Sequence, residues 1–219
     1  MFTNAKIAIC NEIQKRKACF LPMSQQKRRL WLLAWYKLLI LQRLLDVMTQ
    51  YIIRPVAEAD ATQITEIYNY YINETTISFE TESLEADEMR NRIDDIAKRF
   101  PYFVATTQGD NRVMGYCYAH QWKERAAYGC TFEVTIYLDK DAKGHGLGSA
   151  LMSRLIDECH KRGDCRALIA CITAENTESL MFHSKMGFEK VSHFKEVGRK
   201  FNRWLDVVDM EMVFDSKHD

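Results

Sequence analysis

The 219-residue sequence lacks repeats and low-complexity stretches, and it holds only three prolines and nine glycines. Its hydrophobic share of 47% and its charged share of 27% are those of a soluble globular protein. These properties exclude the disordered and the collagen-like classes. The length is sufficient for one ordinary domain with a buried core.

The chain as a whole also lacks net charge, because 30 basic residues balance 30 acidic ones. The balance is uneven along the sequence: residues 1–47 carry a net charge of +7, which leaves −7 for the remainder. An acidic body lacks the basic face with which proteins displace counterions from phosphates. We therefore expect no nucleic-acid partner and a small amine-bearing substrate.

The seven cysteines form no CxxC pair and no zinc-ligand spacing, and the sequence shows no convincing export signal. We interpret the cysteines as reduced thiols, mostly small core residues, in a cytoplasmic protein. No constellation of metal ligands is present in the sequence, so we expect no metal.

Residues 1–47 form a basic, leucine-rich extension whose 30–47 stretch suggests a membrane segment. Lys37 and Arg43 interrupt that stretch, and a spanning helix would place both in hydrocarbon, so we expect no membrane insertion. An amphipathic surface or partner helix stays open. We favour a dispensable extension, because domain patterning begins directly after Met48.

The pattern of residues 48–219 predicts one α+β domain, in which strands and helices follow one another without linkers. Ser83 is the expected cap of the second helix. We expect helices over residues 60–73, 84–98, 149–162 and 177–185, and strands over residues 51–54, 102–106, 112–120, 131–138, 167–172, 188–194 and 204–214.

A glycine-rich turn, residues 143–148, joins an expected strand to an expected helix. Alternate glycines let the backbone approach a ligand, and the amides at a helix N-terminus favour an anion such as pyrophosphate. A tight connection without a ligand gives the same pattern. The P-loop is excluded because Ser149 and Ala150 follow Gly148, and the dinucleotide fingerprint is excluded because its third glycine lies one residue later.

The turn resembles the acyl-CoA pyrophosphate loop of the GNAT superfamily, with Lys143 in place of the usual Arg or Gln, followed by Gly146 and Gly148. The resemblance spans about residues 52–214. It narrows to the branch of phosphinothricin and methionine sulfoximine acetyltransferases, which includes bacterial L-amino-acid N-acyltransferases. The matching segments are Ile53-Arg54-Pro55, Ala59-Asp60, Ile67-Tyr68-Asn69, Gly115-Tyr116, Trp122, Thr131-Phe132-Glu133, Asn176, Ser179, His183, Gly187-Phe188 and the run from Val197 to Asp206.

This resemblance implies a single GNAT domain with a mixed, mostly antiparallel central sheet, splayed central strands and flanking helices. It implies an acetyl-CoA-dependent N-acetyltransferase that acts by direct transfer on the α-amino group of a small amino acid or analogue, and it implies a homodimer. The expected acetyl-CoA contacts are Ile136, Tyr137, Leu138, Lys143, Gly144, His145, Gly146, Leu147, Gly148, Ser149, Asn176 and Ser179.

Glu133 is the expected general base, because a carboxylate is unusual in a strand otherwise built of Thr, Val, Ile and Tyr. A solvent-facing strand position is the alternative that the pattern alone favours. The resemblance assigns His183 to hydrogen bonding or general acid work at the CoA sulfur, although a helix histidine is more often a surface or packed residue. The expected substrate contacts are Trp122, Lys123, Arg125, Tyr128 and Glu133.

Four further residues depart from the branch, and these departures leave the substrate open. His120-Gln121 replaces the usual Gly-Asp, Val134 replaces a common histidine, and Asn202 replaces a common glycine. Another amine, such as a polyamine or a protein N-terminus, remains an alternative acceptor. A non-catalytic acyl-CoA-binding module is a third possibility. A covalent acyl-enzyme on Cys130 or Cys171 is disfavoured, because neither has an evident His and acid pair in the sequence.

Overall fold

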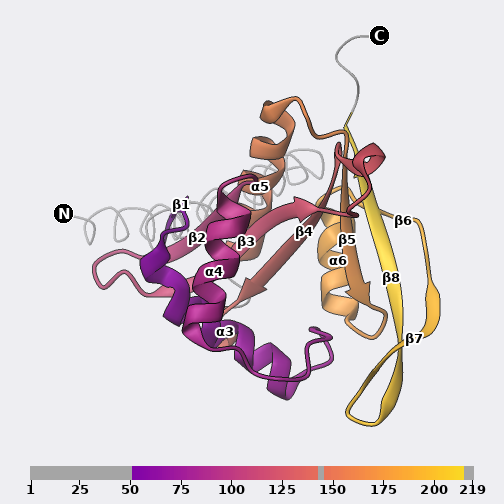
Figure 1. The fold of residues 1–219 in the computed structure, drawn as a ribbon, viewed down its shortest axis with the longest axis horizontal. Coiled ribbons are helices and arrows are strands. Elements are labelled where there is room, and N and C mark those ends of the chain that lie inside the picture. Colours follow the sequence, from indigo (N-terminus) through magenta and orange to yellow (C-terminus); the bar gives the residue numbers. More distant parts are fainter. Residues whose placement is uncertain (1–50, 143–145, 215–219) are drawn as a thin grey trace, which may run out of the picture. The chain divides into compact units, whose positions relative to one another are not determined.

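The computed structural model describes residues 51–142 and 146–214, and the predictions for residues 1–47 lie outside this range (Figure 1). The helices are α3 (Ala61–Glu74), α4 (Ala86–Ala97), α5 (Leu147–Arg162) and α6 (Thr177–Lys185). The strands are β1 (Tyr51–Pro55), β2 (Tyr102–Thr107), β3 (Val113–Gln121), β4 (Thr131–Leu138), β5 (Ala167–Thr173), β6 (Glu189–Lys190), β7 (Phe194–Lys200) and β8 (Arg203–Val213).

The eight strands form one sheet in the order β1-β2-β3-β4-β5-β8-β6, and β7 pairs with β8. Within the described chain, every strand pair is antiparallel except β4 with β5. The helix between β4 and β5 is α5, the crossover that a parallel pair requires. This mixed, mostly antiparallel sheet with flanking helices confirms the fold that the sequence predicts.

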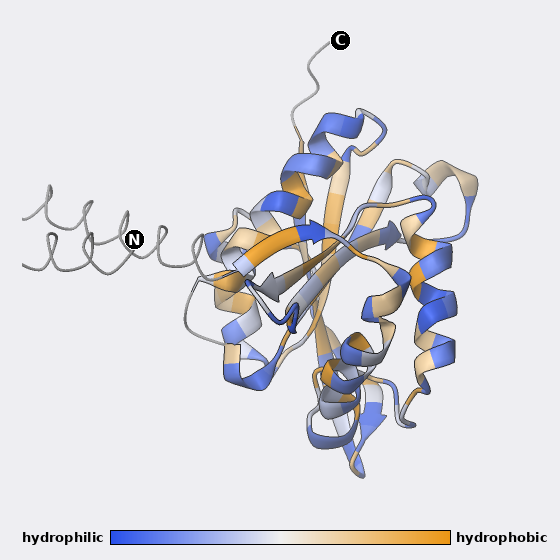
Figure 2. Ribbon diagram, turned by 90° about the vertical axis from the view of Figure 1, so that its left-hand side faces the viewer, coloured by the Kyte–Doolittle hydropathy of each residue, from blue (hydrophilic) through white to orange (hydrophobic). Residues whose placement is uncertain are grey.

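Strands β2, β3 and β5 are largely buried, because each face of the sheet packs against a pair of helices. Along β3, Tyr116 packs in a core with α3 and α4, whereas Cys117 and Ala119 pack in a second core with α5. This alternation follows from the two-residue period of a strand. Figure 2 shows hydrophilic residues along the outer sides of the helices and hydrophobic stretches in the strands between them.

Two expected elements differ from the structure. The strand expected over residues 188–194 is wrong in its extent: β6 has two residues, and the longer strand β7 starts at Phe194. Helix α4 begins at Ala86 after Glu85, two residues later than expected. Ser83 does not cap it, because the Ser83 hydroxyl instead donates a 3.1 Å hydrogen bond to Oδ1 of Asn73.

Candidate active site

The two parallel strands of the sheet pair over only a short distance. Residues 131–133 of β4 oppose residues 167–169 of β5, and within the described chain no further pairs join these strands. Figure 1 shows them starting side by side and then diverging. Beyond Glu133, β4 keeps its pairing with β3 as far as Leu138. The β5-facing peptide groups of β4 in this stretch are therefore available to a ligand.

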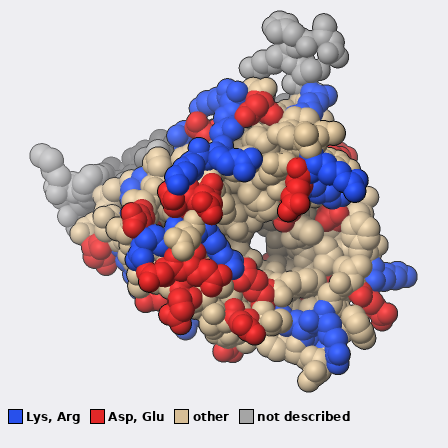
Figure 3. Space-filling model, in the orientation of Figure 1, with Lys and Arg blue, Asp and Glu red and all other residues tan. Residues whose placement is uncertain are grey.

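A cavity of about 230 Å³ lies at this divergence. Ile136 and Leu138 line it with side chains that pack with the α5 core, whereas Tyr137 packs with the α3 and α4 core. The cavity therefore has walls from both faces of the sheet. Its lining also includes Tyr71, Ile77, Gly148, Asn176, Glu178, Ser179 and Phe182. The space-filling view in Figure 3 shows an opening near the middle of the face that is turned toward the viewer.

The N-terminus of α5 forms the second wall of this region. Gly146 precedes the helix with φ 80° and ψ 0°, the left-handed conformation that glycine adopts without a steric penalty. A Cβ at Gly148 would lie 3.4 Å from Leu138 Cδ1 and 3.6 Å from Phe182 Cε2, so the missing side chain leaves the backbone open to the cavity. Leu147 is buried in the core and Ser149 is exposed. The expected contacts Lys143, Gly144 and His145 lie outside the described residues.

Helix α6 begins at a side-chain cap. The Asn176 Oδ1 atom accepts a 3.2 Å hydrogen bond from the amide of Ser179, and both residues line the cavity. The sequence left a capping role and a ligand-binding role open for Asn176. The capping role is present in the structure, and the ligand-binding role stays a prediction.

His183, on the same helix, is 3% exposed and packs edge-on between the rings of Phe182 and Phe188. Its Nδ1 is 2.9 Å from the carbonyl oxygen of Ser179, which can only accept a hydrogen bond. Burial lowers the pKa of His183 and outweighs the opposing effect of this hydrogen bond, so the ring is neutral at pH 7. Nε2 is buried without a hydrogen-bond partner among the described residues. The neutral ring therefore offers an acceptor, and not a proton, at Nε2.

Glu133 projects from β4 on the same face as Tyr137, which is the face that α3 and α4 cover farther along the strand. Its side chain is 26% exposed. Burial raises the pKa of Glu133, the nearby imidazole of His120 opposes this shift, and the carboxylate of Asp209 adds to it. The carboxylate expected to be the base therefore lies at the divergence of β4 and β5, in a site that favours its protonated form more than water does.

His120 and Asp209 lie near Glu133 and were not assigned to the site from the sequence, which considered Cys171 there only as a disfavoured nucleophile. His120 lies directly opposite Glu133 in the β3–β4 pair, with Nε2 3.9 Å from Oε1. Cys171 of β5 donates a 3.1 Å hydrogen bond from Sγ to Oδ1 of Asp209 on β8. The sequence signal was present for His120, which departs from the related branch, but strand pairing was needed to place it beside Glu133.

The thiol of Cys171 is not prepared for nucleophilic attack. Burial, followed by its hydrogen bond to Asp209 and the charge of Glu133, raises its pKa to about 12. A thiol must ionise to act as a nucleophile. This observation disfavours a covalent acyl-enzyme on Cys171.

The loop between β3 and β4 brings three of the expected substrate residues together. The Lys123 Nζ atom lies 3.9 Å from the centre of the Trp122 ring and 5.4 Å from that of Tyr128. The two rings meet edge to face at 5.3 Å. The Trp122 amide donates to the carbonyl of Thr131, two residues before Glu133, so this aromatic group lies at the Glu133 end of the strand pair. Arg125 is exposed and precedes the short 3-10 helix Ala126–Tyr128.

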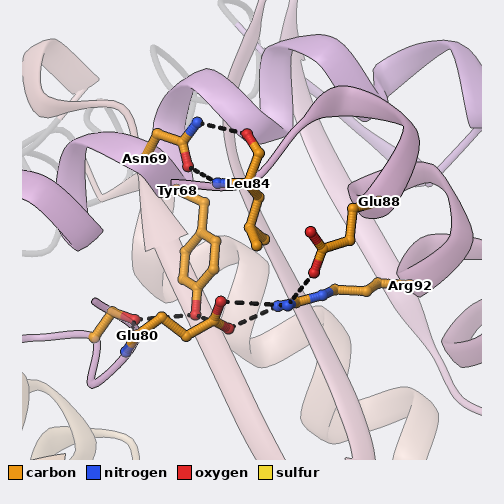
Figure 4. A network of polar contacts seen from close by, with 7 residues as sticks. Tyr68, Asn69, Glu80, Leu84, Glu88 and Arg92 are labelled. Atoms are coloured by element: carbon orange, nitrogen blue, oxygen red, sulfur yellow. Dashed lines mark hydrogen bonds and ion pairs between the residues drawn. The ribbon is translucent and has the colours of Figure 1, made fainter. Parts of the chain in front are cut away.

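A polar network fixes the segment between α3 and α4, which lies over the Tyr137 side of the sheet (Figure 4). Glu80 accepts hydrogen bonds from the Tyr68 hydroxyl at 2.9 Å and from Nη1 of Arg92 at 2.6 Å. Asn69 holds the other end of the segment through two 2.9 Å hydrogen bonds with the backbone of Leu84. The Thr173 hydroxyl of β5 donates to the carbonyl of Thr76 at 2.7 Å. The segment is thus bound to α3 and α4 on one side and to β5 on the other.

No helix within residues 51–142 and 146–214 is long and apolar enough to cross a membrane. No group of three or more His, Cys, Asp and Glu side chains in this range is placed to hold a metal ion.

Sequence comparison places the chain among known enzymes. The acetyltransferase (GNAT) domain family matches residues 53–208. Phosphinothricin N-acetyltransferase from Alcaligenes faecalis is 38% identical over 161 residues, which cover 73% of this chain and 80% of the relative. L-methionine sulfoximine/L-methionine sulfone acetyltransferase from Salmonella typhimurium is 32% identical over 165 residues, which cover 74% of this chain and 94% of the relative.

Solved structures of acetyltransferases also superpose on this chain. The structure of yncA from Salmonella typhimurium with its cofactor acetyl-CoA superposes with a TM-score of 0.73 at 30% identity, and the match covers 77% of this chain and 96% of that one. A GNAT superfamily phosphinothricin acetyltransferase from Sinorhizobium meliloti, in complex with AcCoA, superposes with a TM-score of 0.71 at 34% identity. That match covers 75% of this chain and 88% of that one.

Proposed function

The chain belongs to the GNAT acetyltransferase family, and on that premise we propose that it transfers the acetyl group of acetyl-CoA to the α-amino group of a small amino acid or amino-acid analogue. The relatives named for phosphinothricin and for methionine sulfoximine support this acceptor class. The observation that carries the proposal is the position of Glu133 at the last residue pair before β4 and β5 diverge, on the strand whose residues 136–138 line a cavity with walls from both faces of the sheet.

Acetyl-CoA fits the α5 side of this region. The open backbone at Gly148, the left-handed Gly146 and the helix N-terminus behind them suit a pyrophosphate. The β5-facing peptide groups of residues 136–138 suit the pantetheine arm and the thioester oxygen. Asn176 and Ser179 line the same cavity. Acetyl-CoA supplies the activated acetyl thioester.

Glu133 is the proposed base. The acceptor arrives as an ammonium ion, and its nitrogen attacks only after losing a proton. Glu133 accepts that proton, directly or through one water molecule. The amine nitrogen then bonds to the acetyl carbon, and the carbon–sulfur bond breaks. The thiolate that leaves takes up the second proton, which the nitrogen loses as it becomes an amide. Backbone amides of residues 136–138 stabilise the negative oxygen that forms in between.

His183 is the proposed residue on the sulfur side. Because Nδ1 bonds the carbonyl of Ser179, Nε2 acts as a hydrogen-bond acceptor. This geometry favours a role in holding a water molecule or a thiol S–H over a role as general acid.

The acceptor's acidic group is proposed to meet the loop after β3. Lys123, whose Nζ atom lies over the Trp122 ring, and the exposed Arg125 supply positive charge at the Glu133 end of the strand pair. Asp209 favours a different acceptor class, because a second carboxylate near Glu133 attracts a second positive charge. A polyamine is therefore the second candidate substrate.

We also propose that the protein is a cytoplasmic homodimer. Phe194, Val197, Phe201 and Trp204 of the β7–β8 hairpin are each about half exposed or more, which is an unusual concentration of apolar surface. The five described cysteines are free thiols, as a reducing compartment maintains them. Light scattering of the full chain and of Trp204→Lys tests the dimer, which is expected to weaken in the variant.

The test of the activity is thiol release from acetyl-CoA by the full chain. The acceptor panel holds methionine sulfoximine, methionine sulfone, phosphinothricin, free amino acids and spermidine. We expect turnover with the amino-acid analogues and a loss of about 10²-fold or more in kcat for Glu133→Gln, with acetyl-CoA affinity unchanged. Binding of acetyl-CoA without turnover on any acceptor would instead support a non-catalytic acyl-CoA-binding module.

A further inference from the structure

A hydrogen bond to the backbone selects one neutral tautomer of His120. Its Nδ1 lies 3.0 Å from the carbonyl oxygen of Gln121. A carbonyl oxygen only accepts hydrogen bonds, so Nδ1 carries the proton of the neutral ring. Nε2 then keeps its lone pair, and Nε2 is the ring atom that lies 3.9 Å from Oε1 of Glu133. The imidazole thus presents a basic nitrogen to the carboxyl group.

Glu133 needs such a partner if it is the base. The carboxylate is protonated once in every turnover and must lose that proton before the next acceptor is activated. Burial raises the pKa of Glu133, so its carboxyl group holds the proton more firmly than an exposed glutamate does. The His120 side chain is 34% exposed, which gives it direct access to water.

We propose that His120 relays the proton of Glu133 to solvent, an inference that rests on the proposed function of Glu133. The O–H bond of the Glu133 carboxyl breaks and an N–H bond forms at Nε2, which leaves a carboxylate and an imidazolium. The imidazolium then gives a proton to water. The 3.9 Å separation is spanned by one bridging water molecule or a small side-chain rotation. His120 acts through Glu133 and does not touch the acceptor.

Two of the other titratable groups at this pair, Tyr118 and Cys171, do not compete for the proton. Burial raises the pKa of Tyr118, and burial with the hydrogen bond to Asp209 raises that of Cys171 to about 12, so both stay protonated at neutral pH. The Asp209 charge raises the pKa of Glu133. The groups that face the pair are Tyr118 from β3, Cys171 from β5 and Asp209 from β8. The charges of Arg92 and Glu80, on the α3 and α4 side of the sheet, influence the pKa of Tyr118.

The test compares the full chain with His120→Gln and His120→Ala in the thiol-release assay. We expect kcat at pH 7 to fall by up to about 10²-fold, the lower end of what general acid–base groups contribute, with the KM for acetyl-CoA unchanged. Added imidazole should restore turnover to His120→Ala and leave the unmodified chain unaffected. The matched control is His193→Gln, which removes another histidine–carboxylate contact, 2.8 Å from Asp206 on the β7–β8 hairpin, and should behave as the unmodified chain.

Melting curves and acetyl-CoA binding establish first that each variant is folded, and His120→Asn replaces either variant that is not. Unchanged kcat in the His120 variants would overturn the relay and leave the acetyl transfer intact. Reduced kcat without rescue by imidazole would also overturn it, because a merely structural role gives that result. Absence of turnover in the unmodified chain on every acceptor would overturn the proposed function and the relay together.

Discussion

Arg54 donates two parallel hydrogen bonds to Asp60, from Nη1 to Oδ2 and from Nη2 to Oδ1, each 2.7 Å long. Oδ2 of Asp60 also accepts the amide of Ala57 at 2.8 Å. The Asp60 side chain is 5% exposed and that of Arg54 is 28% exposed. This paired contact joins β1 to the start of α3.

Asp60→Ala is expected to lower the free energy of unfolding by about 2 kcal/mol, less than for a fully buried pair because Arg54 still reaches water. Urea denaturation measures the change. Asp94→Ala, which breaks the exposed contact with Lys98, is the control and should leave stability unchanged. Equal losses of unfolding free energy in the two variants would show that the buried contact stabilises the fold no more than the exposed one.

The same pair predicts a pH dependence of stability. Burial alone would raise the pKa of Asp60, but the hydrogen bonds from Arg54 and Ala57 and the Arg54 charge outweigh it and lower the pKa. A lowered carboxyl pKa stabilises the fold above the unfolded-state value of about 3.9, and the contribution is lost as the pH falls through the folded-state value. The stability gap between the unmodified chain and Asp60→Ala should therefore narrow below about pH 4.

Glu133→Gln should raise the Tm at pH 7 while it lowers activity. Burial, with the Asp209 charge, raises the pKa of Glu133 against the opposing effect of His120, so the folded state disfavours the carboxylate that the unfolded chain carries freely. The protonated Glu133 side chain therefore contributes to the stability of the folded state below the unfolded-state pKa, and this contribution is lost as the pH rises through the folded-state pKa. The difference in Tm should vanish below about pH 4, where both forms are neutral. Melting curves at several pH values test this, and a lower Tm for the variant at pH 7 would contradict it.

Two substitutions at Gly148 test helix stability and ligand binding separately. A Cβ at this position would meet Leu138, Phe182 and Ile136 at 3.4 to 3.9 Å, which are ordinary contacts. Gly148→Ala should therefore stabilise α5 by up to about 1 kcal/mol, because alanine is the better helix former. Gly148→Leu places a larger side chain in the cavity and should abolish acetyl-CoA binding. Calorimetric titration checks both, and tight binding by Gly148→Leu would remove this cavity from the site.

Asn176 allows its capping and binding roles to be separated. Asn176→Ala removes the acceptor for the Ser179 amide and should cost about 1 kcal/mol. Asn176→Ser keeps a capping oxygen and should restore most of that stability. If the amide group also binds acetyl-CoA, both variants should weaken binding to a similar extent. Restored binding in Asn176→Ser would assign Asn176 to capping alone.

The sequence was most informative where local patterns determine the structure. The strand over 131–138 and the helix over 177–185 match β4 and α6 at both ends. The β-branched residues of β4 favour a strand, and Asn176 and Gly187 mark the ends of α6. The region around residues 188–200 was less predictable, because Glu196 adopts φ 54° and the register of β7 against β8 shifts between Phe194 and Gly198.

In the candidate site, too, only the residues marked by a local sequence pattern could be predicted. Glu133 could be singled out from the sequence because a carboxylate is rare within a strand of β-branched and aromatic residues. Its partners could not, because His120 reaches it through strand pairing and Asp209 is 76 residues away along the chain. Which residues lie beside Glu133 depends on the order and register of the four strands β3, β4, β5 and β8, and neither property is encoded locally.

The short pairing of β4 with β5 has a consequence for solubility. An unpaired strand edge on the outside of a protein is a template on which other chains add strands and aggregate. Here the unpaired edge lies inside the sheet, between two of its own strands, with α5 and α6 packed on one face. To pair with this edge, a second polypeptide would have to enter between β4 and β5, which helices cover on both faces of the sheet. The fold thus keeps backbone donors and acceptors ready for a ligand without offering them to other proteins.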